Sequence, residues 1–211
     1  MRQKQLTLAF PKRGGKQPGA GRPRTRDYPG VLGTLVPHLA RKRFPSRRAV
    51  HVTQRLRPGV GYLRKQGPAQ VLLRAFRDAA ERNRMRIAHY SIQGNHLHLV
   101  VEAEDAVALS RGMQGLAVRI ARRLNRHLGR QGTVFADRYH ANVLESRRQV
   151  ANAVRYVVRN YRHHAREYLP SEWHDEYATQ ETRPLAEPKL WLLRVGWLAE
   201  PAHPSRAFEP P

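Results

Sequence analysis

Short apolar runs with alternating polarity predict the strands of this chain. The segment Arg48–Arg55 alternates β-branched and polar residues, which favours a first strand. A second strand is expected over about 86–92, and a tight turn at Gly94-Asn95 joins it as a hairpin to a third over 96–101. The stretch Thr133–Leu144 is expected to be extended and to lead into a further strand.

Three segments repeat apolar residues at helical spacing. The first runs from Pro68 to Asn83, the second from Glu104-Asp105 to about Leu128, and the third follows Ser146, which has capping-box spacing to Gln149. Their apolar positions are, in order, Val71, Leu72, Ala75, Phe76 and Ala79; Leu109, Met113, Leu116, Ile120 and Leu124; Val150, Val154, Val157, Val158 and Tyr161. The pattern predicts an α+β domain in which three helices pack on an antiparallel sheet.

The charge of the chain points to a polyanionic partner. The 39 basic and 16 acidic residues give a net charge of +23, and only six of the basic residues are Lys. The planar fork of Arg suits phosphate oxygens and guanine edges, so nucleic acid is the first partner to consider. The absence of Cys excludes disulfides, thiolate zinc sites and cysteine nucleophiles. With neither a long apolar run nor a signal peptide, we expect a cytoplasmic, nucleoid-associated protein with no membrane partner.

The chain divides into three parts by composition. Residues 1–45 form a basic arm, expected to be flexible, 46–166 hold the periodic elements, and 167–211 form an extension whose Trp and Leu residues suggest short packed segments. Within the arm, Gly19–Arg24 is similar to the core of an AT-hook, with Arg22 and Arg24 as DNA contacts. Ala20 replaces the usual Arg, which favours a nonspecific phosphate-binding tail instead.

Further basic residues are candidate DNA contacts. The second predicted helix carries an Arg-rich face opposite its apolar stripe, which is either a solvated face or a nucleic-acid surface. The net charge favours the nucleic-acid surface. The candidates are Arg119, Arg122, Arg123 and Arg126 on this helix, with Arg138 and His140 before the last one.

Two histidines stand on the expected third strand. Because successive side chains of a strand point to opposite faces, His96 and His98 project together while Leu97, Leu99 and Val101 enter the other face. Two adjacent imidazoles make half a metal site, although they are also compatible with ordinary half-buried histidines.

A tyrosine and an asparagine share one face of the last helix. Tyr156 and Asn160 are four residues apart and lie off the valine stripe, so their side chains are free to line a cleft. The alternative is that Tyr156 packs against a neighbour and that Asn160 is solvated.

Together these residues resemble the single-tyrosine HUH transposases, and most closely the REP-associated tyrosine transposases of bacteria. The supporting motifs, in the family's order, are Val50-His51-Val52-Thr53-Gln54-Arg55, Asn95-His96-Leu97-His98, Gly132-Thr133-Val134-Phe135 with Arg138-Tyr139-His140, and Tyr156-Val157-Val158-Arg159-Asn160. The chain departs from the family where it has Gly94 for a frequent Pro, Asn160-Tyr161 for a frequent Asn-Pro, and Leu56 for a usual Gly. The first two departures change turn geometry without removing a ligand.

The resemblance implies a ferredoxin-like core and a metal-dependent reaction on DNA. His96, His98 and the amide oxygen of Asn160 would hold Mg²⁺ or Mn²⁺, and Tyr156 would attack a phosphodiester of single-stranded or hairpin DNA. The products would be a 5′-phosphotyrosyl link and a free 3′-hydroxyl, and a second DNA end could reverse the step, which gives strand transfer. The enzyme would act as a monomer or homodimer.

Two alternatives remain open at this point. One is a DNA-binding protein of the same fold that recognises repeat hairpins without catalysis. The other is a metal-dependent or two-histidine phosphoesterase, and the two-histidine type requires two His-x-Ser/Thr motifs.

Overall fold

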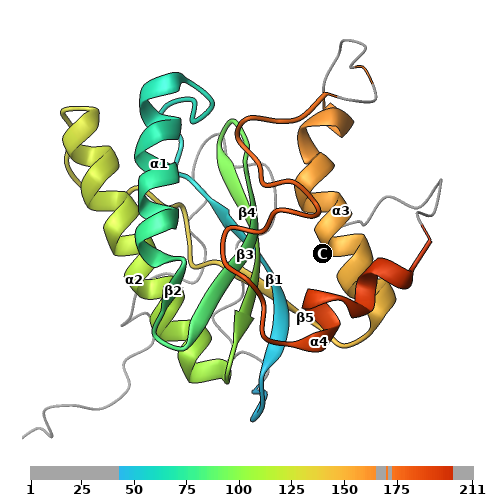
Figure 1. The fold of residues 1–211 in the computed structure, drawn as a ribbon. Coiled ribbons are helices and arrows are strands. Elements are labelled where there is room, and N and C mark those ends of the chain that lie inside the picture. Colours follow the sequence, from blue (N-terminus) through green and yellow to red (C-terminus); the bar gives the residue numbers. More distant parts are fainter. Residues whose placement is uncertain (1–42, 165–169, 171–172, 202–211) are drawn as a thin grey trace, which may run out of the picture.

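The computed structural model describes residues 43–164, 170 and 173–201 (Figure 1). Arg22 and Arg24, the predicted DNA contacts of the N-terminal arm, lie outside the described residues. None of the helices within these ranges is long and apolar enough to span a bilayer.

The centre of the fold is a five-stranded antiparallel sheet with the order β2-β3-β4-β1-β5. Its strands are β1 Arg48–Arg55, β2 Glu81–Arg82, β3 Met85–Ile92, β4 His96–Ala103 and β5 His140–Leu144. The helices are α1 Gln66–Ala79, α2 Ala106–His127, α3 Arg147–His164 and α4 Trp191–Arg194, followed by the 3₁₀ helix η1 Gly196–Ala199. The predicted α+β fold with three helices packed on an antiparallel sheet is confirmed.

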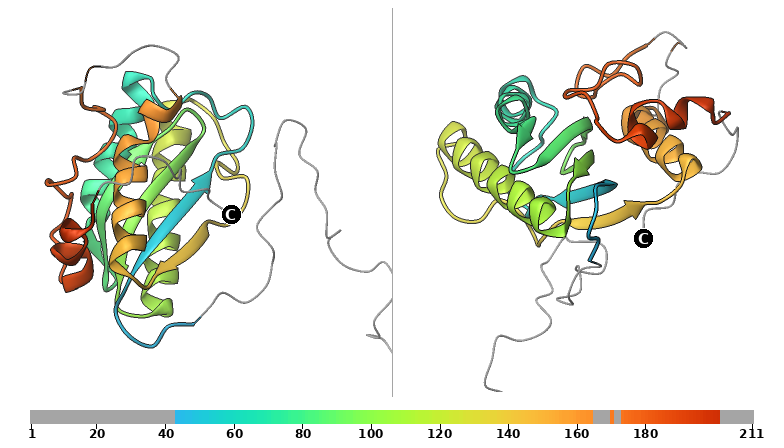
Figure 2. Two further views of the ribbon diagram at one scale, coloured as in Figure 1. Left: turned by 90° about the vertical axis from the view of Figure 1, so that its right-hand side faces the viewer. Right: turned by 60° about the horizontal axis from the view of Figure 1, so that its bottom comes forward.

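Different helices cover the two faces of the sheet (Figures 1 and 2). α1 and α2 lie side by side on one face, whereas α3, α4 and η1 lie on the other. The alternation of β4 divides its side chains as predicted: Leu97, Leu99 and Val101 join the core beneath α1 and α2, and Val100 packs beneath α3.

The helix boundaries follow local capping in two cases and depart from the prediction in one. The carboxylate of Asp105 accepts a hydrogen bond from the Ala108 amide at the start of α2. Ser146 and Gln149 form the predicted capping box, each accepting a backbone hydrogen bond from the other at 3.2 Å. The helix expected over 68–83 instead ends at Ala79.

That helix ends early because the chain turns back into a hairpin. Asn83 and Arg84 both adopt positive φ angles, 54° and 58°, and connect β2 to β3. Such a two-residue turn requires left-handed backbone at both positions, which a helix cannot accommodate.

The C-terminal extension covers an edge of the sheet. The Ile92 amide donates to the Tyr177 carbonyl at 2.9 Å, and the Leu185 amide donates to the Ala88 carbonyl at 2.8 Å, so the extension satisfies backbone groups that β3 would otherwise expose. Its Asp175 forms a two-pronged ion pair with Arg64 at 2.8 and 2.9 Å, and both side chains are buried. The extension therefore packs against the sheet as part of one fold.

Candidate active site

The two histidines of β4 converge on one point. The Nε2 atoms of His96 and His98 lie 3.0 Å apart, and the two rings are inclined at 86°. His98 is only 2% exposed, while Nδ1 of the partly exposed His96 lies 2.8 Å from Oδ1 of Asn95. The predicted pairing on one face of the strand is thus present, with the Nε2 edges of both rings directed at each other.

A third histidine from β1 adjoins this pair. The register places Thr53 opposite His98 and His51 opposite Val100, so both β1 side chains share the face of the histidine pair. Nε2 of His51 and Oγ1 of Thr53 each lie 3.3 Å from Nδ1 of His98. Burial lowers the pKa of His51 to about 4, and the charge of His140 adds to the shift. His51 is therefore neutral at physiological pH.

Tyr156 faces the histidines from α3. Its ring centroid lies 5.2 Å from that of His98 and 5.9 Å from that of His51, in both cases edge to face. Burial raises the pKa of the Tyr156 phenol, and the nearby Asn160 side chain partly offsets this effect. The phenol is therefore protonated at neutral pH and needs activation before it can act as a nucleophile.

Asn160 lies one helical turn beyond Tyr156 and is fully buried. Among the described residues, neither the oxygen nor the nitrogen of its amide reaches a partner in full hydrogen-bond geometry, although the amide is close enough to the Tyr156 phenol to lower its pKa. A buried polar group without a partner destabilises the fold, so its retention points to an interaction with something that binds there.

The geometry of the donors fits a divalent cation. Ligands at right angles around an octahedral ion with bonds of about 2.1 Å lie about 3.0 Å from each other, which matches the separation of the two Nε2 atoms. The described ranges contain no group of three or more His, Cys, Asp or Glu side chains that could hold a metal, so such a site needs other donors besides, for example the Asn160 amide, DNA or water. Imidazole and amide oxygen hold hard ions only loosely, which allows a phosphate oxygen to enter.

The predicted DNA contacts fall into two groups. Arg119, Arg122, Arg123 and Arg126 lie on α2, across the sheet from Tyr156, and Arg123 forms an ion pair with Asp78 of α1. His140 of β5 lies opposite Thr53 and so stands beside the histidine cluster, and Arg138 lies two residues before His140, the first residue of that strand. The structure thus brings His140 near the candidate site and leaves the Arg residues of α2 on the far side.

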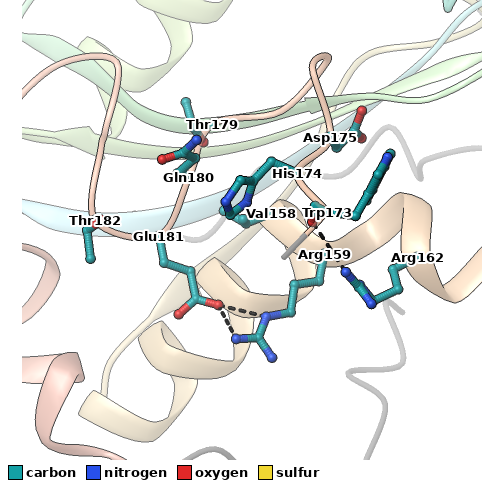
Figure 3. A pocket seen from close by; sticks show the side chains of 10 residues that line it. All are labelled: Val158, Arg159, Arg162, Trp173, His174, Asp175, Thr179, Gln180, Glu181 and Thr182. Atoms are coloured by element: carbon teal, nitrogen blue, oxygen red, sulfur yellow. Dashed lines mark hydrogen bonds and ion pairs between the residues drawn. The ribbon is translucent and has the colours of Figure 1, made fainter. Parts of the chain in front are cut away.

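A cavity of about 500 Å³ opens on a different side of α3 from the one that carries Tyr156 and Asn160 (Figure 3). It lies between that helix and residues 173–182 of the extension, and an ion pair between Arg159 and Glu181 closes part of its wall. None of the predicted site residues that the structure describes lines this cavity.

The requirement for two His-x-Ser/Thr motifs is met by the sequence but not by the geometry. His51-Val52-Thr53 lies on β1 and His89-Tyr90-Ser91 on β3, with β4 between them. Both histidines are nearly inaccessible, 3% and 2% exposed, and His89 contacts the hydroxyl of Thr179 in the extension. A two-histidine phosphoesterase must bring both imidazoles to one substrate phosphate, whereas His89 lies two strands from His51 and its Nδ1 faces the Thr179 hydroxyl.

Comparison with known proteins decides the family. The family model described as "Transposase IS200 like" matches residues 49–160, which include the histidine pair, Tyr156 and Asn160. The chain belongs to the IS200-like transposase family. The family predicted from the four motifs is therefore confirmed.

One of two similar solved structures supports the fold of this chain. A REP-associated tyrosine transposase bound to a REP hairpin matches with a TM-score of 0.53 and 14% identity, over 68% of this chain and 82% of that chain. A candidate transposase from Deinococcus radiodurans matches with a TM-score of 0.42 and 17% identity, over 50% of this chain and 85% of that one. A search of curated proteins finds no match.

Sequence reasoning missed one member of the cluster. His51 was part of a family motif but was not predicted as a site residue. The alternation of β1 puts His51 and Thr53 on one face, yet only the pairing of β1 with β4 shows that this face is the one with the histidine pair.

Proposed function

We propose that this transposase is a metal-dependent endonuclease and strand transferase for single-stranded DNA. The observation that carries the proposal is the convergence of a phenol on α3 with two imidazoles on β4. The ring centroids of Tyr156 and His98 lie 5.2 Å apart. Nucleophile and cation-binding groups on separate elements that meet at one point are what nucleophilic attack on a phosphodiester requires.

His96, His98 and Oδ1 of Asn160 would hold the cation, Mg²⁺ or Mn²⁺. When bound, the ion polarises a phosphodiester and stabilises the charge that develops on its oxygens. Asn160 and Tyr156 are one turn apart on α3, so the same helix places a ligand and the nucleophile. A shift of this helix would change both together.

The phenolic oxygen of Tyr156 would form the new bond to phosphorus. The bond from phosphorus to the 3′-oxygen breaks, the phenol gives up its proton, and the 3′-oxygen leaves as a hydroxyl after protonation. The 5′-phosphotyrosyl link retains the energy of the broken bond, so a 3′-hydroxyl of a second DNA end can reverse the step and complete strand transfer.

The substrate would be unpaired DNA beside a hairpin. A duplex would hide the scissile phosphate from a nucleophile held between a helix and a sheet, and a net charge of +23 favours a nucleic-acid backbone. The REP-associated transposase that shares this fold was solved with a REP hairpin, and a repeat hairpin is the substrate we propose here as well. Arg138 and His140 are the proposed contacts near the cleavage site, with Arg22, Arg24 and the Arg residues of α2 as outlying phosphate contacts.

A covalent adduct tests the proposal. The protein is incubated with Mn²⁺ and a DNA library that has a fixed hairpin and randomised single-stranded flanks, and adducts that survive SDS are collected. We expect an adduct with the wild type, none after Tyr156→Phe, and none with EDTA. A wild type that retains hairpin DNA in a salt-sensitive manner but forms no adduct would instead be a DNA-binding protein without catalysis.

A further inference from the structure

His98 has a different neighbour at each ring nitrogen. Its Nε2 lies 3.0 Å from Nε2 of His96, and its Nδ1 lies 3.3 Å from Nε2 of His51. The three imidazoles thus form a chain from the partly exposed His96 to the buried His51, which is 3% exposed.

The contact between His51 and His98 has the geometry of a ring-to-ring hydrogen bond. The rings are inclined by only 14°, and their centroids lie 5.4 Å apart, farther than the two nitrogens by about the width of one ring. The rings therefore meet edge to edge, close to a common plane, and not face to face. An imidazole N–H and an imidazole lone pair both lie in the ring plane, so this arrangement aligns donor and acceptor.

A neutral imidazole carries its hydrogen on one nitrogen only. If Nε2 of His98 is to bind a cation, the hydrogen must be on Nδ1, and a buried Nδ1–H needs an acceptor. We infer that His51 is the positioning residue that accepts this hydrogen bond, and so fixes the tautomer and ring orientation in which His98 can bind a metal ion. The inference rests on the proposed function, because it concerns the cation site proposed there.

Thr53 alone would not fix the tautomer. Its hydroxyl also lies 3.3 Å from Nδ1 of His98, but a hydroxyl rotates and can donate as readily as it accepts. The planar ring of His51 is held by burial, and its contact with the Tyr156 ring of α3 is edge to face. It therefore offers a lone pair in a fixed direction once its own hydrogen is on Nδ1.

Variants at His51 can be matched with a variant at a second buried histidine. His51→Phe keeps a flat ring and removes both nitrogens, whereas His51→Gln restores an acceptor oxygen. His89→Phe is the control, because His89 is equally buried on the same face but contacts Thr179 instead of the histidine pair. Thr53→Val measures the separate contribution of the hydroxyl.

The first readout is the affinity for Mn²⁺ alone, measured at one pH from the paramagnetic resonance signal of the free ion. We expect His51→Phe to weaken binding about 10- to 100-fold, the range seen when partners of metal-binding histidines are removed. His51→Gln should recover part of this loss, and His89→Phe should stay within about twofold of the wild type. Unchanged affinity in folded His51→Phe would overturn the inference.

The second readout uses the wild type and so does not depend on the folding of a variant. Nitrogen-15 spectra of the metal-free protein report which ring nitrogen of His98 carries the hydrogen. We expect hydrogen on Nδ1, and a main population with hydrogen on Nε2 would contradict the assignment.

His96→Ala separates this inference from the proposed function. If His96→Ala abolishes Mn²⁺ binding while His51→Phe has no effect, only the role of His51 is wrong. If His96→Ala binds Mn²⁺ as well as the wild type does, the proposed cation site itself is wrong, and the role of His51 falls with it.

Discussion

The two faces of the sheet are both buried, but they hold different kinds of residue. The core beneath α1 and α2 is built from side chains such as Phe76, Leu99 and Ile120. The face beneath α3 mixes apolar side chains with buried His51 and His98. Buried polar groups stabilise a fold less than well-packed apolar ones, so the second face retains them for another reason. The contrast indicates that one face mainly stabilises the molecule and that the other carries its chemistry.

The largest expected effect is a loss of function on the α3 face without a loss of stability. Tyr156→Phe should reduce DNA cleavage by at least about 10⁴-fold, as expected for the loss of a nucleophile. It removes a single hydroxyl, so the free energy of unfolding should change by less than about 1 kcal/mol. Adduct formation and urea unfolding on the same preparation check both parts. A large stability loss together with residual cleavage would contradict the contrast between the faces.

Two adjacent residues of β4 test the same contrast within one strand. Leu99→Ala, on the α1 and α2 face, should lower the free energy of unfolding by about 3 kcal/mol because it leaves a cavity in a packed core. The folded fraction of this variant should still cleave DNA.

His98→Ala should show the opposite balance. We expect loss of cleavage, retained salt-sensitive DNA binding and a smaller stability loss than Leu99→Ala causes. Urea denaturation and cleavage per folded molecule measure both variants. Normal cleavage by His98→Ala would show that the cation site is wrongly assigned.

The buried histidines should make the stability of the α3 face depend on pH. Burial lowers the pKa of His89 to about 4 from an ordinary value of 6.5. Between these values the unfolded chain binds a proton that the folded chain does not, so stability is complete above about pH 6.5 and falls as the pH drops toward 4. The loss is on the order of 3 kcal/mol at pH 4.

The variant His89→Phe identifies the histidine responsible. Thermal unfolding followed from pH 7 to pH 4 should show a shallower decline for this variant than for the wild type. Parallel curves for the two proteins would mean that His89 has an ordinary pKa in the folded state.

The smallest effect concerns the local start of α3. Ser146→Ala removes the side chain that accepts from the Gln149 amide and should cost about 1 kcal/mol. Ser110, an exposed residue within α2, provides the control, since Ala at that position should be neutral or stabilise by a few tenths of a kcal/mol. Chemical denaturation of both variants distinguishes a capping effect from a general effect of losing a serine.

Local sequence patterns predicted much of the fold. The alternation in β4 separated Leu99 from His98 correctly, and the capping residues Asp105 and Ser146 marked the starts of α2 and α3. The predicted end of α1 was wrong, because the left-handed turn at Asn83 and Arg84 interrupts a segment whose composition still suits a helix.

Contacts between distant segments could not be predicted in the same way. His51 joins the site only through the register of β1 against β4, and Arg64 meets Asp175 across 111 positions of sequence. The extension binds β3 mainly through backbone hydrogen bonds, which leave no periodic pattern in the side chains. The fold also puts the Arg residues of α2 across the sheet from Tyr156, a separation that no helical pattern reveals.

The chemistry of the covalent link tests the central claim most directly. DNA labelled on either side of the cleaved phosphate is allowed to form the adduct, the protein is digested, and the labelled peptide is identified by mass spectrometry. The account predicts that the strand on the 3′ side of the break is attached through its 5′-phosphate to Tyr156 and that the other strand ends in a free 3′-hydroxyl. Attachment at any other residue, or through a 3′-phosphate, would contradict it.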